Sequence, residues 1–114
     1  MSTWINLEAP QGNDTTWNLQ VLNNGVPMNL TGCTLKLYVK ISNVTADGDS
    51  STVTYTVGSG LTVVNAIAGK LTFTQPHTAN QAKAPGTYWW RLDITDSFGN
   101  VGTALDGNLY TLAV

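Results

Sequence analysis

The amino-acid sequence predicts an all-β fold, an antiparallel sandwich of about seven to nine short strands with one short helical crossing. Three observations lead to this prediction. Apolar and polar residues alternate at period two through most of the chain, turn signals recur about every ten residues, and almost no segment shows helical periodicity. Short strands at this spacing are typical of two packed antiparallel sheets.

The first half of the chain contains the clearest strand, CTLKLYVKI at residues 33–41. Its odd-numbered residues are apolar and its even-numbered residues are polar or aromatic, so one face is expected to be buried. Before it, WNLQVL at 17–22 places Trp17, Leu19 and Val21 inward. NNG at 23–25 predicts a turn leading into VPMNLTG at 26–32.

The next strands are TVTYTV at 52–57, LTVVN at 61–65 and KLTFT at 70–74, separated by turns at GSG (58–60) and AG (68–69). HTANQAKAPG at 77–86 breaks the alternation. Thr78 is a suitable N-cap residue, the following residues include several good helix formers, and Pro85 with Gly86 ends any helix after little more than one turn. This segment is therefore the expected helical crossing.

The last third begins with TYWWRLDIT at 87–95, in which Tyr88, Trp90, Leu92 and Ile94 form the inward set. Because successive strand side chains point to opposite faces, Trp89 is expected to face outward. DSFGN at 96–100 predicts a hairpin turn, VGTAL at 101–105 the returning strand, DGN at 106–108 a second turn, and NLYTLAV at 108–114 the final strand.

With 114 residues the chain has room for one core, and we predict an immunoglobulin-like sandwich over residues 13–114. Residues 1–12 are expected to form an N-terminal arm or an edge strand. Such short polar-apolar arms often become ordered on a partner, so this segment is also expected to contact neighbouring chains.

Composition excludes several kinds of partner. Charged residues make up 11% of the chain, its net charge is −2, and its five basic residues form no patch of the kind that binds a phosphate backbone. Nucleic acid is therefore not an expected partner. No apolar stretch is long enough to span a membrane, and residues 1–14 have neither the basic region nor the apolar stretch of a secretion signal, so we expect a soluble protein made in the cytoplasm.

Residues that could carry out catalysis are few. The single imidazole, His77, lies in the helical crossing, and the single thiol, Cys33, is expected to be a small buried hydrophobe. No pair of carboxylates is marked as catalytic, one His with one Cys cannot complete a zinc site, and ADGDS at 46–50 lacks most ligands of a calcium loop. We therefore expect neither enzymatic activity nor a cofactor or metal.

Aromatic residues are the most informative about function. Trp17 and Trp90 are expected in the core, whereas Trp4 lies in a short apolar N-terminal stretch and Trp89 points away from the core. Three alternatives remain for Trp89. It is covered by its own chain, for example by Arg91 stacking on the ring, or it is buried against another chain, or it stacks on a sugar.

Two longer stretches of the chain carry a resemblance. GNDTTWNLQVLNNGVPMNLTGCTLKLYVK and PGTYWWRLDITDSFGNVGTALDGNLYTL, joined by the GKLTFT strand and the Thr-Ala crossing, resemble the immunoglobulin-like N-terminal domain of phage baseplate upper proteins and related virion proteins. The matching turn residues are Gly25, Pro27, Asn29, Leu30, Thr31, Gly32, Gly86, Tyr88, Asp96 and Gly99. The resemblance covers residues 12 to about 112.

This resemblance implies a virion protein made in the cytoplasm of the host bacterium. Because no stalk or receptor-binding domain follows the sandwich, we expect a capsid decoration protein added in many copies, with a tail or baseplate attachment protein as the alternative. The expected partners are the major capsid protein or a tail or baseplate protein, and further copies of the chain, with a trimer favoured. The expected interface residues are Trp4, Ile5, Leu7, Tyr38, Trp89 and Arg91.

A carbohydrate-binding module is a further alternative, in which Tyr38 and Trp89 form a platform for a host glycan. This reading requires that the two side chains lie on the same sheet, within about 7 Å across neighbouring strands.

Overall fold

A computed structural model describes residues 3–10, 14–23, 25–41, 52–75 and 86–112. These residues form strands and turns, and no helix occurs among them. The strands are β1 (Thr3–Trp4), β2 (Leu7–Pro10), β3 (Thr15–Gln20), β4 (Leu22–Asn23), β5 (Val26–Pro27), β6 (Thr34–Lys40), β7 (Val53–Val57), β8 (Gly60–Asn65), β9 (Lys70–Gln75), β10 (Gly86–Thr95) and β11 (Val101–Leu112). Residues 77–85 of the predicted helical crossing and the ADGDS segment at 46–50 lie outside the described residues.

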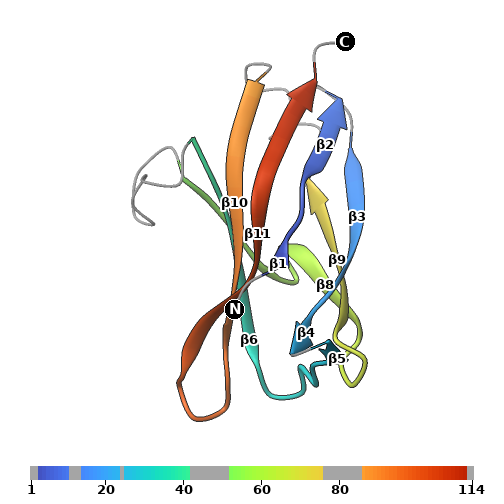
Figure 1. Cartoon of the computed structure of the whole chain (residues 1–114), viewed down its shortest axis with the longest axis vertical. Coiled ribbons are helices and arrows are strands. Elements are labelled where there is room, and N and C mark those ends of the chain that lie inside the picture. The colour runs from blue at the N-terminus through green and yellow to red at the C-terminus, as the bar shows by residue number, and fades with distance from the viewer. Residues whose placement is uncertain (1–2, 11–13, 24, 42–51, 76–85, 113–114) are drawn as a thin grey trace.

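The strands form two layers that enclose one core (Figure 1). Pairing runs in the order β1-β11-β10-β6-β7-β8-β9-β3, and β2 also pairs with β11. We call β1, β2, β11, β10, β6 and β7 the front sheet, and β8, β9 and β3 the back sheet. The chain passes between them at a tight corner, where Thr56 and Ser59 exchange backbone hydrogen bonds of 3.1 and 2.8 Å. The all-β sandwich predicted from the sequence is thus confirmed.

Period-two alternation builds the core as predicted. The buried apolar residues of the front sheet are Leu35, Leu37 and Val39 on β6, Trp90, Leu92 and Ile94 on β10, and Leu105 and Leu109 on β11. Leu19, Leu61, Leu71 and Phe73 face them from the back sheet. Trp17 is half-buried and stacks on Phe73, with 5.1 Å between ring centroids. Cys33 is half-buried and packs against the same core.

The N-terminal residues belong to the front sheet. β1 and β2 both run parallel to β11, in register from Thr3 with Leu105 to Pro10 with Leu112. Leu7 and Ala9 are buried in the core. These residues therefore complete the sandwich of their own chain.

The turn expected at DGN (106–108) is absent, because β11 continues through these residues to Leu112. Gly107 instead lies within the strand, at a position where a side chain would not fit. A Cβ atom at this position would collide with the backbone carbonyl of Ile5, where the N-terminal segment crosses β11. The Ile5 N–H donates to the Asp106 carbonyl at 2.7 Å, and the Trp90 indole Nε1–H donates to the Ile5 carbonyl at 3.0 Å. The glycine thus permits a close backbone contact.

The hairpin turn predicted at 96–100 is confirmed. The Asp96 carboxylate accepts hydrogen bonds from the backbone N–H groups of Phe98 and Asn100, at 2.9 and 3.0 Å. Gly99 adopts a positive φ of 86° and donates to the Asp96 carbonyl. The bonds from Asn100 first, and those from Phe98 and Gly99 after them, hold the pKa of Asp96 below its ordinary value of 3.8.

Replacing Gly107 by alanine should destabilise the domain. The new methyl group must displace the Ile5 carbonyl, and we expect a loss of about 2 kcal/mol in the free energy of unfolding, measured with urea. Gly102→Ala is the matched control on the same strand, since its Cβ would meet nothing within 4 Å. It should change the free energy of unfolding by less than about 0.5 kcal/mol. Equal losses in the two variants would contradict this account of Gly107.

The hairpin turn should loosen at low pH. Because the pKa of Asp96 is lowered in the folded state, its contribution is complete above the unfolded-state pKa and is lost as the pH falls through the folded-state pKa. Amide proton shifts and exchange rates of Phe98 and Asn100, followed by NMR from about pH 6 to about pH 2, should report this change. Asp96→Asn keeps an acceptor oxygen at every pH and should abolish the transition.

Candidate functional site

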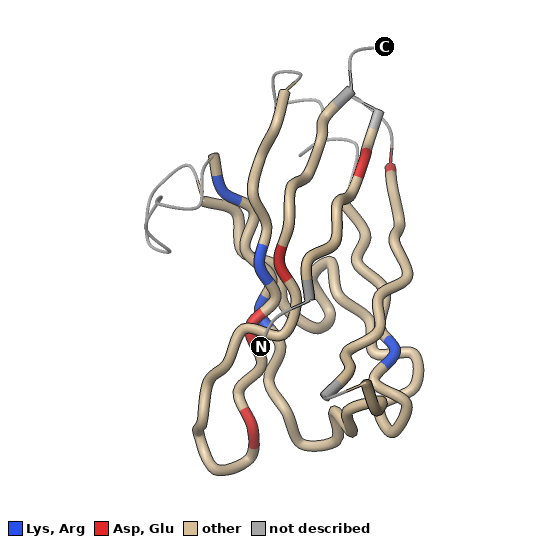
Figure 2. Tube along the Cα trace, viewed as in Figure 1, with Lys and Arg blue, Asp and Glu red and all other residues tan. Residues whose placement is uncertain are grey.

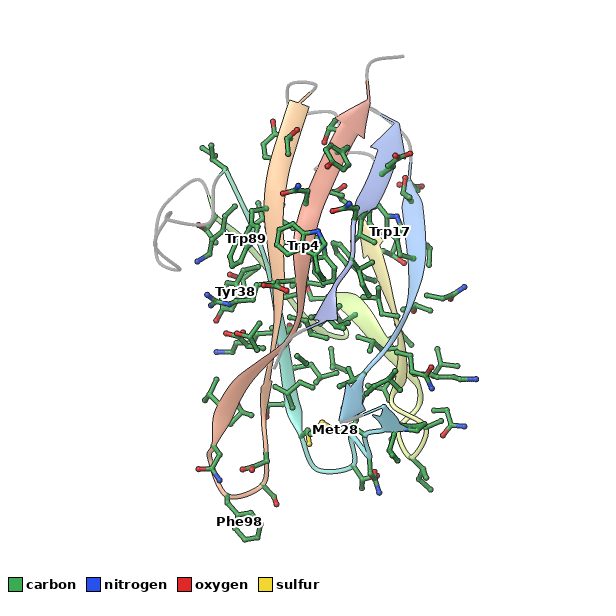
Figure 3. The ribbon with its side chains drawn as sticks, viewed as in Figure 1. Trp4, Trp17, Met28, Tyr38, Trp89 and Phe98 are labelled. Carbon is green, nitrogen blue, oxygen red and sulfur yellow. The ribbon has the colours of Figure 1, made fainter. Side chains whose placement is uncertain are left out.

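The outward surface of the front sheet, which we call the outer face, brings together four of the six predicted interface residues. Strand register places Trp4 beside Asp106, Asp106 opposite Arg91, and Arg91 opposite Tyr38. One row across β1, β11, β10 and β6 is thus formed by Trp4, Asp106, Arg91 and Tyr38. Trp89 lies two residues before Arg91 on β10 and points to the same face. Figure 3 shows Trp4, Trp89 and Tyr38 on this side of the molecule.

Two aromatic rings and two cations pack together at the centre of the outer face. The Arg91 guanidinium carbon lies 4.8 Å from the Tyr38 ring centroid and 5.9 Å from that of Trp89. The Lys40 Nζ lies 5.6 and 5.7 Å from the same two centroids. Only 3% of Lys40 is exposed, and ring faces that attract cations offset part of the cost of removing its charge from water.

Carboxylate contacts fix Arg91 in this position. The Arg91 Nε lies 2.9 Å from the Asp93 Oδ1, and the hydroxyl of Thr103 donates to the same oxygen at 2.9 Å. Both side chains of the ion pair are largely covered, so the guanidinium is held between a carboxylate and the Tyr38 ring. The structure therefore shows Trp89 half-covered by side chains of its own sheet.

Trp4 is the most exposed of the four tryptophans that the structure describes, with 56% of its surface accessible. Its indole Nε1–H donates to the Asn6 side-chain oxygen at 3.0 Å, and the same oxygen accepts the Asn108 backbone N–H at 3.4 Å. These bonds orient the indole and leave much of its apolar surface in solvent.

Ile5 and Leu7 do not join the outer face. Leu7 is buried, and Ile5 is half-buried and packs against the core. The alternation in WINL separates Trp4 from both of them, which is the signal that should have removed Leu7 from the expected interface.

The opposite charges of the outer face lie on different strands (Figure 2). Glu8 on β2 and Asp106 on β11 are acidic, whereas the exposed Lys36 on β6 is basic and the buried Lys40 lies on the same strand. Arg91 and Asp93 on β10, between the two sides, pair with each other. The outer face thus has an acidic side and a basic side.

A second surface lies at the end of the sandwich that carries the β10–β11 turn, and we call it the apolar end. A groove of about 280 Å³ separates the β4–β5 hairpin from β10 and β11, with Val21, Met28 and Ile94 among its lining residues. Phe98 at the tip of the turn is 90% exposed. The sequence signal for this surface was an aromatic residue within the turn DSFGN.

Groups suited to catalysis or metal binding are scarce in the described part of the chain. No cluster of three or more His, Cys, Asp or Glu residues is found there that could hold a metal ion. His77 and the ADGDS segment at 46–50 lie outside it. Burial raises the pKa of the Tyr55 hydroxyl, but this group lies inside the sandwich and not on its surface. No helix long and apolar enough to cross a membrane is found among the described residues.

Known proteins share both the sequence pattern and the fold. The BppU N-terminal domain family matches residues 1–103. Among solved structures, the N-terminal domain of phage TP901-1 ORF48 is similar with a TM-score of 0.55 and 14% sequence identity, covering 97% of this chain and 84% of that chain. At this identity the structural likeness shows a shared fold. No curated protein matches.

The family match confirms the resemblance noted in the sequence, and it includes every residue of the row on the outer face except Asp106. Because it covers nearly the whole chain, the protein belongs to the family of the phage baseplate upper protein N-terminal domain, a structural domain of the virion.

Proposed function

We propose that this chain is a non-enzymatic structural component of a phage tail, which joins the baseplate through protein–protein contacts of its outer face. The family match over residues 1–103 carries the proposal. The capsid decoration role favoured from the sequence depended on where the chain ends, and the family match supports its alternative, tail or baseplate attachment.

The composition of the outer face suits a protein partner. Interface residues that contribute most to binding are enriched in Trp, Tyr and Arg, and such residues bind best when they lose little freedom on association. Tyr38 and Arg91 already pack on each other, and the Trp4 indole is held by Asn6. A partner would therefore meet side chains that are fixed before binding.

The glycan platform receives partial support. Tyr38 and Trp89 do lie on neighbouring strands of the same sheet, which is the first of the two conditions of that hypothesis. However, Arg91 and Lys40 lie within 6 Å of both ring centroids, so the rings and the cations form one packed cluster. A sugar stacking on the rings would compete with these cations, whereas a protein surface could pack over all four side chains.

Fractionated virions should locate the chain in the tail. Heads and tails of the phage that encodes it would be separated on a gradient and analysed by quantitative mass spectrometry. We expect its peptides to be found in the tail fraction together with those of the tail proteins, because its family is a baseplate domain. Peptides that follow the major capsid protein would contradict this proposal and restore the decoration role.

Surface variants should show which surface makes the attachment. Trp4→Ser removes the most exposed tryptophan of the outer face, and we expect at least a tenfold loss of incorporation into tails, measured by mass spectrometry of particles. Phe98→Ser is the control, since it removes an exposed aromatic residue from the apolar end and should leave incorporation unchanged. The opposite pattern would place the attachment at the apolar end.

A further inference from the structure

The division of charge on the outer face makes this surface complementary to itself. The acidic side lies on β2 and β11, and the basic side lies on β6, with a neutral ion pair on β10 between them (Figure 2). If a second copy is turned over onto the first about an axis parallel to the strands, the β11 side of each copy, with Asp106, lies over the β10 side of the other copy, with Arg91. If the axis runs across the strands, β6 lies over β6 of the second copy, and like charges meet.

Strand register shows which side chains would meet. Trp4, Asp106, Arg91 and Tyr38 lie at one level on the consecutive strands β1, β11, β10 and β6. A two-fold axis parallel to the strands and between β11 and β10 exchanges β11 with β10 and β1 with β6, and it keeps the level. Asp106 then faces Arg91 of the second copy, and Trp4 faces Tyr38 of the second copy.

The side chains of this row suit such contacts. No ion pair of the Asp106 carboxylate occurs within the described chain, although Arg91 is its cross-strand neighbour, because Arg91 pairs with Asp93 instead. Trp4 is 56% exposed. Each copy therefore offers an indole and a carboxylate on one side of the axis, and an aromatic ring and a fixed guanidinium on the other.

We propose that the outer face binds a second copy of this chain around this two-fold axis. Trp4 of each copy then contacts Tyr38 of the other, and Asp106 of each copy faces Arg91 of the other. The inference rests on the proposed function, because it names the partner of the outer face within the baseplate. Each contact occurs twice, as an isologous interface requires. The assembly is a dimer, in place of the trimer expected from the sequence. Because sheets twist, the contact is limited to the central rows and its affinity is moderate.

Charge reversal tests this arrangement. Sedimentation velocity from micromolar to millimolar protein should show wild-type chains of 12.2 kDa pairing as the concentration rises. Asp106→Arg places like charges across the axis, and so does Arg91→Asp, so each variant alone should associate at least tenfold more weakly. Mixing the two variants restores opposite charges at both contacts, and the mixture should form a heterodimer with close to wild-type affinity.

Controls separate this effect from misfolding and from bulk charge. Lys70→Glu changes a charge on the back sheet and should leave the dimer intact, and circular dichroism should show that every variant is folded. Trp4→Ser, at an exposed position, should weaken pairing without altering a charge.

Two results would overturn the inference: a wild-type chain that stays monomeric at millimolar concentration, or a mixture of the charge variants that associates no better than each variant alone. The fractionation of heads and tails decides the proposed function separately. A monomeric chain found in tails would keep the tail role and show that a different baseplate protein covers the outer face.

Discussion

The crossing of the N-terminal segment over Gly107 determines where the residues of the outer face lie. At this point the Ile5 N–H bonds to the Asp106 carbonyl, and the Ile5 carbonyl accepts the indole N–H of the buried Trp90. The second bond satisfies a polar group inside the core that would otherwise cost about 1–3 kcal/mol. It also ties the N-terminal segment to β10, so that Trp4 lies beside Asp106 and Leu7 enters the core.

Alternation together with turn signals predicted most of the longer strands and most of the core. In TYWWRLDIT it correctly separates the buried Trp90 from the outward Trp89. It could not explain DGN, because a glycine between two polar residues is typical of a turn, and the actual reason is the Ile5 backbone, about a hundred residues away in the chain. Local patterns do not contain contacts of this range.

The same limit applies to the candidate site. Sequence parity predicted that Tyr38 and Trp89 point outward, but only strand register shows that Arg91 and Lys40 lie at both rings. The burial of Lys40 had no sequence signal, since lysine is almost never buried unless it is paired. The chain has few charges, and several of them lie on the outer face. Their arrangement restricts the orientation in which a partner can bind this face, which a purely apolar surface would not do.

The two surfaces of the domain can act independently. A two-fold axis parallel to the strands preserves strand direction, so the β10–β11 turns of both copies point the same way. Phe98 and the groove beside β4 and β5 lie at that end of the sandwich and take no part in the row of Trp4, Asp106, Arg91 and Tyr38. Both apolar ends of a pair would thus face the same side of the assembly. Pairing through the outer face determines the relative orientation of the two copies, and it leaves their apolar ends uncovered.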